Sequence, residues 1–199
     1  MKNVLFLVLL FVANVTFSQD VFTNKSIGFT IQQPPTWIKA IEGQDLENLK
    51  SNTKLDKNAL NKLLEESKGT IQVVSFYKYP IDATFGMIPT IKVNFKSNPH
   101  KNFPDFRKSI EESFSGIKTL FPDFKYTSKP TEGVIDGKKC FIASFMYTVK
   151  SKEGNTKVKT IQYAIPVKDK FYQITLIDTE NDNINIELFE KIITTIKIR

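Results

Sequence analysis

Two side chains that could serve as a nucleophile and a base, Cys140 and His100, occur once each in the 199-residue chain. A nucleophile needs a base within hydrogen-bonding reach, and a triad adds a residue that orients the base. His100 lies in the polar stretch SNPHKNF, which is typical of a solvated loop. Cys140 lies in the apolar stretch GKKCFIASFMYTV, which predicts a buried, inert thiol. No G-x-S-x-G pattern occurs. We therefore assign no catalytic residue and expect a protein that is not an enzyme.

Metal and cofactor patterns are also missing from the sequence. Paired cysteines, a histidine cluster and H-E-x-x-H do not occur, and the eight glycines are dispersed rather than gathered in a phosphate loop. The acidic stretch from Asp178 to Glu187 could in principle supply oxygen ligands to calcium. An EF-hand loop starting at Asp178 would need glycine at its sixth position and glutamate at its twelfth, where Asn183 and Phe189 stand. We interpret this stretch as a solvated turn and predict neither a metal nor a cofactor.

Aromatic side chains are the remaining candidates for ligand binding. Trp37 is the sole tryptophan and follows the pair Pro34-Pro35, while Tyr77 and Tyr79 alternate in SFYKYP. Exposed rings of this kind could stack on sugars or contact a partner. A sheet covered on both faces would bury them instead, and we favour burial, with Trp37 acting as a packing wedge under a helix. Trp37, Tyr77 and Tyr79 stay as the candidate binding residues.

The positive charge of the chain does not by itself indicate a nucleic-acid partner. The formal net charge is +7, but 26 of the 28 basic residues are lysines, and acidic residues are interspersed with them. Readers of nucleic acid favour arginine, whose planar fork binds guanine and phosphate in a bidentate way. We interpret the charge as solvation, with a polyanion-binding face as the less favoured alternative, and predict no nucleic-acid partner.

The N-terminal residues 1–18 have the pattern of a secretory signal peptide. Lys2 supplies a positive start, Val4–Ala13 is an apolar run too short to span a membrane, and Thr16 and Ser18 are small residues at cleavage-site spacing. We predict cleavage between Ser18 and Gln19, a secreted or periplasmic location and no transmembrane anchor afterwards. A buried N-terminal helix is the less favoured alternative.

The mature chain, residues 19–199, shows no internal repeat or linker and is predicted to be one domain. Alternating apolar residues predict strands at 27–32, 70–79 and 90–97. A short helix is expected from Asp56 to Lys68. The strongest helix begins near Phe103, because large apolar residues then recur every three or four positions: Phe103, Phe106, Ile110, Phe114, Ile117 and Phe121. This stripe is expected to pack on a sheet.

The C-terminal half predicts an antiparallel meander followed by a helix. Asp136-Gly137 is a strong hairpin signal, and Glu153–Asn155 and Val167–Lys170 are further turns between strand patterns. Asn185 is expected to cap a closing helix with the apolar stripe Leu188, Phe189, Ile192, Ile193 and Ile196. Strands, a long helix, a meander and a terminal helix together predict an α+β fold, an antiparallel β-sheet covered by helices.

Several short motifs give the chain a resemblance to the PsbP/Mog-like superfamily. The early element GF-x-I-x-x-P-x-x-W is matched by Gly28, Phe29, Ile31, Pro34 or Pro35, and Trp37, and a later strand element is matched by Gly137 and Tyr147. The strands IQYAI and FYQITL and the terminal helix FEKIITTIKI complete the match over most of residues 27–199. The resemblance implies an α/β/α sandwich, no shared catalytic residues, and a role as an adaptor or binding domain. Its members include photosystem accessory subunits, Ran-binding import factors and secreted bacterial proteins.

Two functions follow as expectations from the sequence. The first is a secreted or periplasmic, non-enzymatic binding or accessory domain that engages a protein partner at the cell envelope. The alternative is an envelope glycan-binding protein or hydrolase that uses exposed aromatics, namely Trp37, Tyr77 or Tyr79, with the lysine excess favouring acidic groups.

Overall fold

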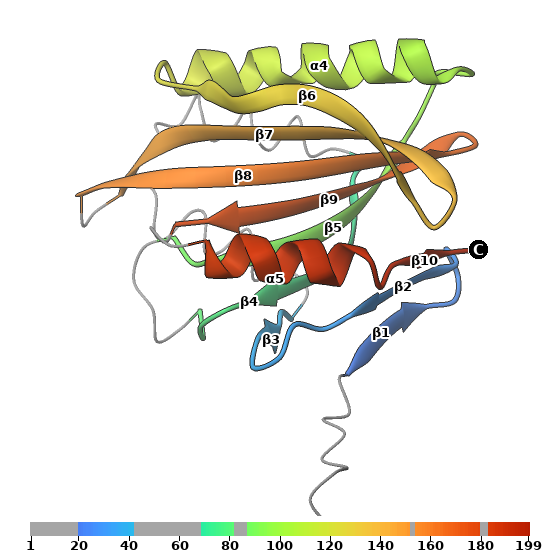
Figure 1. Ribbon diagram of the computed structural model, residues 1–199, viewed down its shortest axis with the longest axis horizontal. Coiled ribbons are helices and arrows are strands. Elements are labelled where there is room, and N and C mark those ends of the chain that lie inside the picture. The colour runs from blue at the N-terminus through green and yellow to red at the C-terminus, as the bar shows by residue number, and fades with distance from the viewer. Residues whose placement is uncertain (1–19, 42–68, 82–86, 152–153, 180–182) are drawn as a thin grey trace, which may run out of the picture.

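The computed structural model describes residues 20–41, 69–81, 87–151, 154–179 and 183–199 (Figure 1). These residues form a large antiparallel sheet in the order β3-β4-β5-β9-β8-β7-β6. Its strands are β3 (Ile38–Lys39), β4 (Ile71–Tyr77), β5 (Thr90–Ser97), β6 (Lys125–Ile135), β7 (Lys138–Ser151), β8 (Gly154–Val167) and β9 (Lys170–Asp178). The predicted signal peptide and the predicted helix at 56–68 lie outside the described residues. The prediction that residues 19–199 are one domain stays a prediction.

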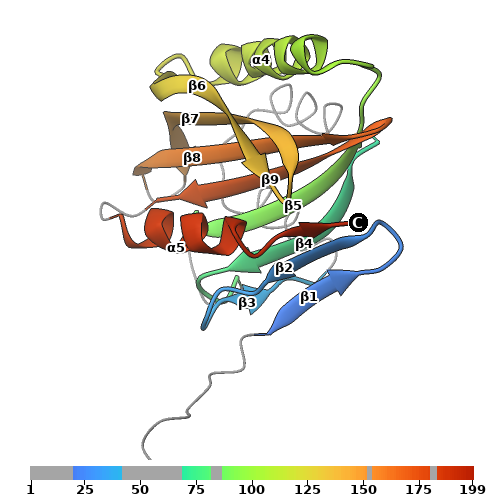
Figure 2. The same ribbon diagram turned by 45° about the vertical axis from the view of Figure 1, so that its right-hand side comes forward.

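A second, three-stranded sheet joins the two ends of the described chain. It has the order β1-β2-β10, with β1 (Val21–Asn24), β2 (Phe29–Gln32) and β10 (Lys197–Ile198). The predicted strand at 27–32 is confirmed as β2, whereas β1 and β10 were not predicted. Figures 1 and 2 both show this sheet next to α5 (Ile184–Ile193), in the lower part of the view where β3 and β4 of the large sheet also lie.

Tyr172 of the large sheet contacts β2 and the β1–β2 turn, and the Arg199 backbone closes the small sheet on the same turn. Tyr172 of β9 stacks on Phe29 with ring centroids 4.9 Å apart, and its hydroxyl donates to the Ile27 carbonyl. Gly28 has φ +67° and accepts a hydrogen bond from the Arg199 backbone N–H at 2.9 Å. The glycine therefore provides the backbone conformation that lets the last strand approach the β1–β2 turn.

The last strand is also held by the turn between β6 and β7. The Asp136 carboxylate accepts hydrogen bonds from the Ile198 backbone N–H at 2.8 Å and from Lys197 Nζ at 3.3 Å. These contacts, the backbone one first, lower the pKa of Asp136 below its ordinary value. Asp136 and Gly137 both have positive φ, and Ile135 pairs with Lys138, so the predicted two-residue hairpin is confirmed.

Of the two other predicted turns, Val167–Lys170 agrees with the register, whereas the turn predicted at Glu153–Asn155 lies too late in the sequence, because Gly154 and Asn155 already pair with β7. Lys168 and Asp169 connect β8 to β9, since Val167 pairs with Lys170. Ser151 pairs with Gly154, so β7 and β8 are joined by residues 152–153, and Gly154 already belongs to β8. The four strands β6 to β9 are consecutive neighbours, which confirms the predicted meander.

The two faces of the large sheet carry different side chains. One face is apolar and packs against α5 and the small sheet. Its core includes Ile91, Val93, Ile174 and Leu176, all of which are fully buried. Because side chains alternate along a strand, the neighbouring residues of β5 and β9 face the opposite side, towards α4 (Phe103–Leu120).

Helix α4 covers part of that opposite face. Asn102 caps the helix by accepting from the Asp105 backbone N–H, and Pro104 occupies the first turn. The predicted stripe packs on the sheet: Phe106, Ile110 and Phe114 are buried against a cluster formed by Phe141, Ala143, Phe145, Ala164 and Phe171. The predicted α/β/α sandwich is therefore confirmed only in part, because α5 covers one face of the large sheet together with the small sheet. None of the helices formed by the described residues is both long and apolar enough to cross a membrane.

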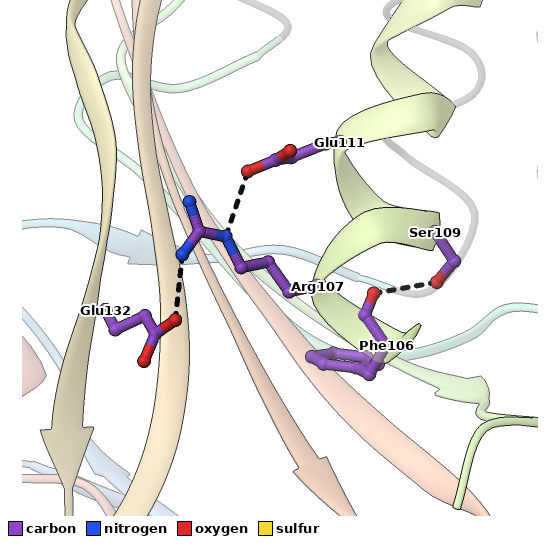
Figure 3. A network of polar contacts seen from close by, with 5 residues as sticks. All are labelled: Phe106, Arg107, Ser109, Glu111 and Glu132. Atoms are coloured by element: carbon purple, nitrogen blue, oxygen red, sulfur yellow. Dashed lines mark hydrogen bonds and ion pairs between the residues drawn. The ribbon is translucent and has the colours of Figure 1, made fainter. Parts of the chain in front are cut away.

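An arginine holds α4 to the edge strand β6. Figure 3 shows Arg107 between two carboxylates. Its Nε donates to Glu111 at 3.0 Å on the same helix, and its Nη1 donates to Glu132 of β6 at 2.8 Å. Both hydrogen bonds raise the pKa of Arg107. The pair links the helix to β6 at the surface, beside the buried apolar stripe that packs α4 on the sheet.

Strand β6 is an edge strand with an irregular register. Its pairing with β7 shifts between Tyr126 and Ser128 and again between Ser128 and Thr131. Lys125, Lys129 and Pro130 lie in the same strand. Pro130 has no backbone N–H to donate to a neighbouring strand, and the two register shifts are irregularities of the kind that bend a strand.

One prediction about the terminal helix is wrong. Asn183, not Asn185, is the N-cap residue of α5, and its side chain makes no capping hydrogen bond. Asn185 lies inside the helix, is buried, and donates from Nδ2 to the Asp178 carboxylate at 2.9 Å. The asparagine binds a buried carboxylate at the end of β9 rather than the helix backbone.

Candidate functional site

The three aromatic candidates lie in different surroundings. Trp37 is 4% exposed and belongs to the core between the two sheets, as the packing interpretation predicts. Its backbone is fixed by a turn, since its N–H donates to the Pro34 carbonyl and its carbonyl accepts from Gln33 Nε2. Tyr77 is also 4% exposed, while Tyr79, beyond the end of β4, is 40% exposed. Trp37 and Tyr77 thus present no open ring face for stacking. Tyr79 is the one of the three that is exposed, and Lys78 Nζ lies over its ring, 5.4 Å from the centroid.

The single cysteine and the single histidine show no contact with each other among the described interactions. Cys140 is fully buried, and burial raises the pKa of its thiol to about 11. The thiolate that a nucleophilic cysteine needs is therefore disfavoured near neutral pH. The His100 backbone N–H donates to Asn98 Oδ1 at 3.1 Å, which places the histidine in a structured turn. Among the described residues, no group of three or more histidine, cysteine or acidic side chains could hold a metal ion.

A row of carboxamides crosses the sheet on the α4 side. Gln72 of β4 pairs with Asn94 of β5, and Asn94 pairs with Gln173 of β9. Directly paired residues place their side chains next to each other on one face. The row continues to β8, because Gln173 Nε2 donates to Gln162 Oε1 at 2.8 Å. We call these four residues the amide row.

Within the described part of the chain, one oxygen atom of the amide row accepts no hydrogen bond. Asn94 Oδ1 is buried and has no hydrogen-bond partner there. A buried carbonyl oxygen without a donor costs about 1–3 kcal/mol. The fold bears this cost, because the atom is buried away from solvent.

A groove lies between the second half of α4 and the sheet, next to the amide row. It has a volume of about 420 Å³ and is lined by Lys96, Ser113, Phe114, Ser115, Gly116, Ile117, Thr119, Gln162 and Gln173. Its volume is within the range of small-molecule sites, roughly 300–1,000 Å³. We call this space the α4 groove.

Sequence reasoning missed the α4 groove. The alternation in β5 assigned Lys92, Asn94 and Lys96 to the face opposite the core, which is correct, but a solvated face is the usual interpretation of such a pattern. All three are half-buried. The signal that could have located the groove is Gln162 and Gln173, two amides in central strands of an otherwise apolar meander.

A second surface feature lies at the β4 side of the large sheet. The short strand β3 pairs only with Phe76 and Tyr77, and the Ala40 N–H then bonds to the Ser75 carbonyl. Three exposed isoleucines lie along this side: Ile38, Ile41 and Ile71. We call it the β3–β4 edge. Exposed apolar side chains along a sheet edge are typical of protein-interaction sites.

The sheet order, the α4 face and the closing helix together define a PsbP-like fold. The structure is similar to that of cyanobacterial PsbP (CyanoP) from Synechocystis sp. PCC 6803, with a TM-score of 0.56 and 11% identity over 94% of this chain and 96% of that chain. The resemblance predicted from the early G-F-x-I motif and Trp37 is thus confirmed at the level of the fold.

Other solved structures are similar to this chain as well. A protein from Bacteroides thetaiotaomicron VPI-5482 matches with a TM-score of 0.51 and 11% identity over 91% of this chain, which spans about half (48%) of that protein. LpqN of Mycobacterium tuberculosis, described as involved in cell envelope biogenesis, reaches a TM-score of 0.48 at 10% identity, a likeness too weak to inform function. No protein-family model matches the sequence, and no curated protein is significantly similar to it.

Proposed function

We propose that the protein is a non-enzymatic binding or accessory domain, exported to the cell envelope, that engages a protein partner. The observation that carries this proposal is the β3–β4 edge. Ile71 is 61% exposed at the start of β4, and Ile38 of β3 is exposed where β3 pairs with the end of β4 at Tyr77. An extended segment of a partner can add a strand at such an edge through backbone hydrogen bonds, while apolar side chains select it. The signal-peptide pattern of residues 1–18 supports the location.

A second candidate function is glycan binding, which the α4 groove favours. Carboxamides and hydroxyls are the groups that hydrogen-bond sugars, and they line the groove. The original basis of this alternative is weakened, since Trp37 and Tyr77 are buried. A glycan site built on stacking would have to use Tyr79 alone among those three rings.

Capture of a partner from the native host tests the main proposal. Tagged wild-type protein and the Ile71→Lys variant are expressed at natural levels and isolated after crosslinking of intact cells. The wild type should recover one reproducible protein, and Ile71→Lys should lose it, because a lysine removes apolar contact and adds a charge at the edge.

The matched control is Val134→Lys. Val134 is 68% exposed and lies on β6, at the opposite edge of the sheet. This variant should recover the partner as the wild type does. Recovery of no reproducible protein, or equal loss in both variants, contradicts a protein-binding function at the β3–β4 edge.

A further inference from the structure

We propose that the α4 groove binds a neutral sugar that carries an acetamido group, of the N-acetylhexosamine class. This inference rests on the glycan-binding candidate function and names the ligand of that site. It is carried by Gln162, a carboxamide that is only 4% exposed, lines the groove and keeps a donor that the fold does not use. The groove is separate from the β3–β4 edge.

The two glutamines on the floor of the groove leave one donor group and one acceptor unused. Gln173 Nε2 donates to Gln162 Oε1 at 2.8 Å. A carboxamide has an oxygen that accepts and a nitrogen that carries two hydrogens. Gln162 Nε2 and Gln173 Oε1 therefore remain, and neither has another partner within the described part of the chain. A single hydrogen bond between two carboxamides leaves one amino group and one carbonyl in whichever sense it runs, so the ligand must offer both an acceptor and a donor.

The unused donor of Gln162 is open to the groove. Its Nε2 is not one of the described polar atoms that are both enclosed and unpartnered, so the atom keeps accessible surface, and the residue lines the groove. Gln162 comes from β8 and Gln173 from the neighbouring strand β9, both in the middle of the large sheet. The sheet therefore holds the two groups in place before a ligand arrives, which lowers the entropic cost of binding.

The helix side of the groove presents acceptors. The Ser113 hydroxyl donates to the Ile110 carbonyl at 2.7 Å, and the Thr119 hydroxyl donates to the Ser115 carbonyl at 2.9 Å. Each hydroxyl has one hydrogen, and each uses it within the helix. Ser113 and Thr119 can then bind a ligand through their oxygen lone pairs, which require donors. The hydroxyl groups of a sugar ring supply such donors.

An apolar surface completes the groove. Phe114 and Ile117 of α4 line it beside the polar groups. An acetamido group matches this combination, since its carbonyl can accept from Gln162, its N–H can donate to Gln173, and its methyl group can contact the apolar wall. A plain hydroxyl group in the same place has no methyl group for that wall. A peptide also carries amides, but its backbone has no hydroxyl groups for Ser113 and Thr119.

Charge does not select the ligand. Lys96 lines the groove, but it already has an interaction partner in the protein. We therefore give this lysine no part in binding and expect a neutral ligand.

A titration followed by NMR tests this proposal, with N-acetylglucosamine as the ligand. Glucose serves as the sugar without the acetamido group, and N-acetylalanine methylamide as the amide without a sugar. N-acetylglucosamine should bind at a single site, about tenfold more tightly than either probe, as expected for one or two additional hydrogen bonds. It should shift the backbone amide resonances of residues 113–119, Gln162 and Gln173.

Variants locate the site. Gln162→Met removes the carboxamide at similar length and should weaken binding of N-acetylglucosamine about tenfold. Gln32→Met is the matched control and should leave binding unchanged, because Gln32 is a half-buried glutamine of β2 in the small sheet. If Gln162→Met does not fold, Thr119→Val tests the helix side at an exposed position and should weaken binding about threefold.

The contrary outcomes separate this proposal from the glycan-binding function on which it rests. Equal binding of glucose, with the same shifted resonances, overturns the acetamido preference and leaves glycan binding in place. Equal binding of N-acetylalanine methylamide overturns the proposal in favour of a peptide site. Absence of binding by both sugars, or shifts confined to other residues, overturns the proposal together with glycan binding at the α4 groove.

Discussion

Replacement of Gly28 by alanine tests how closely the last strand approaches the β1–β2 turn. Gly28 has φ +67°, and a Cβ added there would lie 2.6 Å from the Arg199 carbonyl oxygen. Real Cβ atoms essentially never come closer than 3.0 Å to such an atom, so the backbone would have to move apart by at least 0.4 Å (3.0 − 2.6). That movement acts on the segment that carries the hydrogen bond from the Arg199 N–H to the Gly28 carbonyl.

The expected cost has two parts. An alanine in the left-handed region costs about 1 kcal/mol relative to glycine. Forcing a methyl group against backbone adds the cost of overpacking, about 1–3 kcal/mol. Gly28→Ala should therefore lower the free energy of unfolding by about 2–4 kcal/mol, the sum of these two estimates.

Gly137 provides a matched control. It has φ +73°, and nothing lies within 4 Å of the position of its added Cβ. Gly137→Ala should therefore show the backbone strain alone, about 1 kcal/mol. The difference between the two variants isolates the contact with Arg199.

Urea unfolding followed by Trp37 fluorescence and circular dichroism measures both variants. A chain that ends at Ile198 provides a third comparison, because it lacks the atom with which the new methyl group would clash. In that background Gly28→Ala should cost no more than Gly137→Ala. Equal losses for the two alanine variants in the full chain would refute the inferred close approach.

Four further outcomes are expected. Native protein should give a blue-shifted tryptophan emission that resists aqueous quenchers, since Trp37 is the sole indole and is buried; a red-shifted emission that moves with added glycan would contradict its assignment to the core. Tyr172→Phe should lower the free energy of unfolding by about 1 kcal/mol, because one hydrogen bond between the sheets is lost, and an unchanged urea midpoint would argue against that bond. The folded-state pKa of Asp136 is lowered, so its carboxylate stabilises the fold above its unfolded-state pKa. This contribution is lost as the pH falls through the folded-state pKa. Asp136→Asn should therefore reduce the acid-induced loss of stability, and an unaltered pH profile of stability would disprove this. Cys140 should resist alkylation by iodoacetamide in native protein and react after unfolding, whereas rapid native labelling would show an accessible thiol.

Local patterns in the sequence predicted most of the large sheet and its long helix. Side-chain periodicity within one segment was enough to predict the two faces of β5 and the apolar stripe of α4. Two residues, Asp136 and Gly137, were enough to predict the hairpin turn. Each of these signals is complete within a short stretch, so no tertiary information was needed. The order of these elements predicted the α+β class, and the short motif around Gly28, Phe29 and Trp37 gave the resemblance to the PsbP/Mog-like superfamily.

The small sheet and the α4 groove could not be predicted in this way. Strand β10 has two residues, too few for a periodic pattern, and it pairs with β2 from the opposite end of the chain. The groove depends on where α4 crosses the sheet, which the packing of its buried apolar stripe on the sheet helps to set. The role of Asn185 depends on Asp178, whose burial is a tertiary property. These features arise from contacts between distant segments, which one-dimensional patterns do not encode.

The irregular edge strand β6 has a consequence for assembly. Head-to-tail polymers of sheet proteins require two edges that can both accept a neighbouring strand. Pro130, Lys129 and the two register shifts make β6 a poor template for pairing. A strand recruited at the β3–β4 edge therefore extends the sheet on one side only. If the proposed partner binds there, the complexes should stop at a fixed stoichiometry instead of growing into filaments.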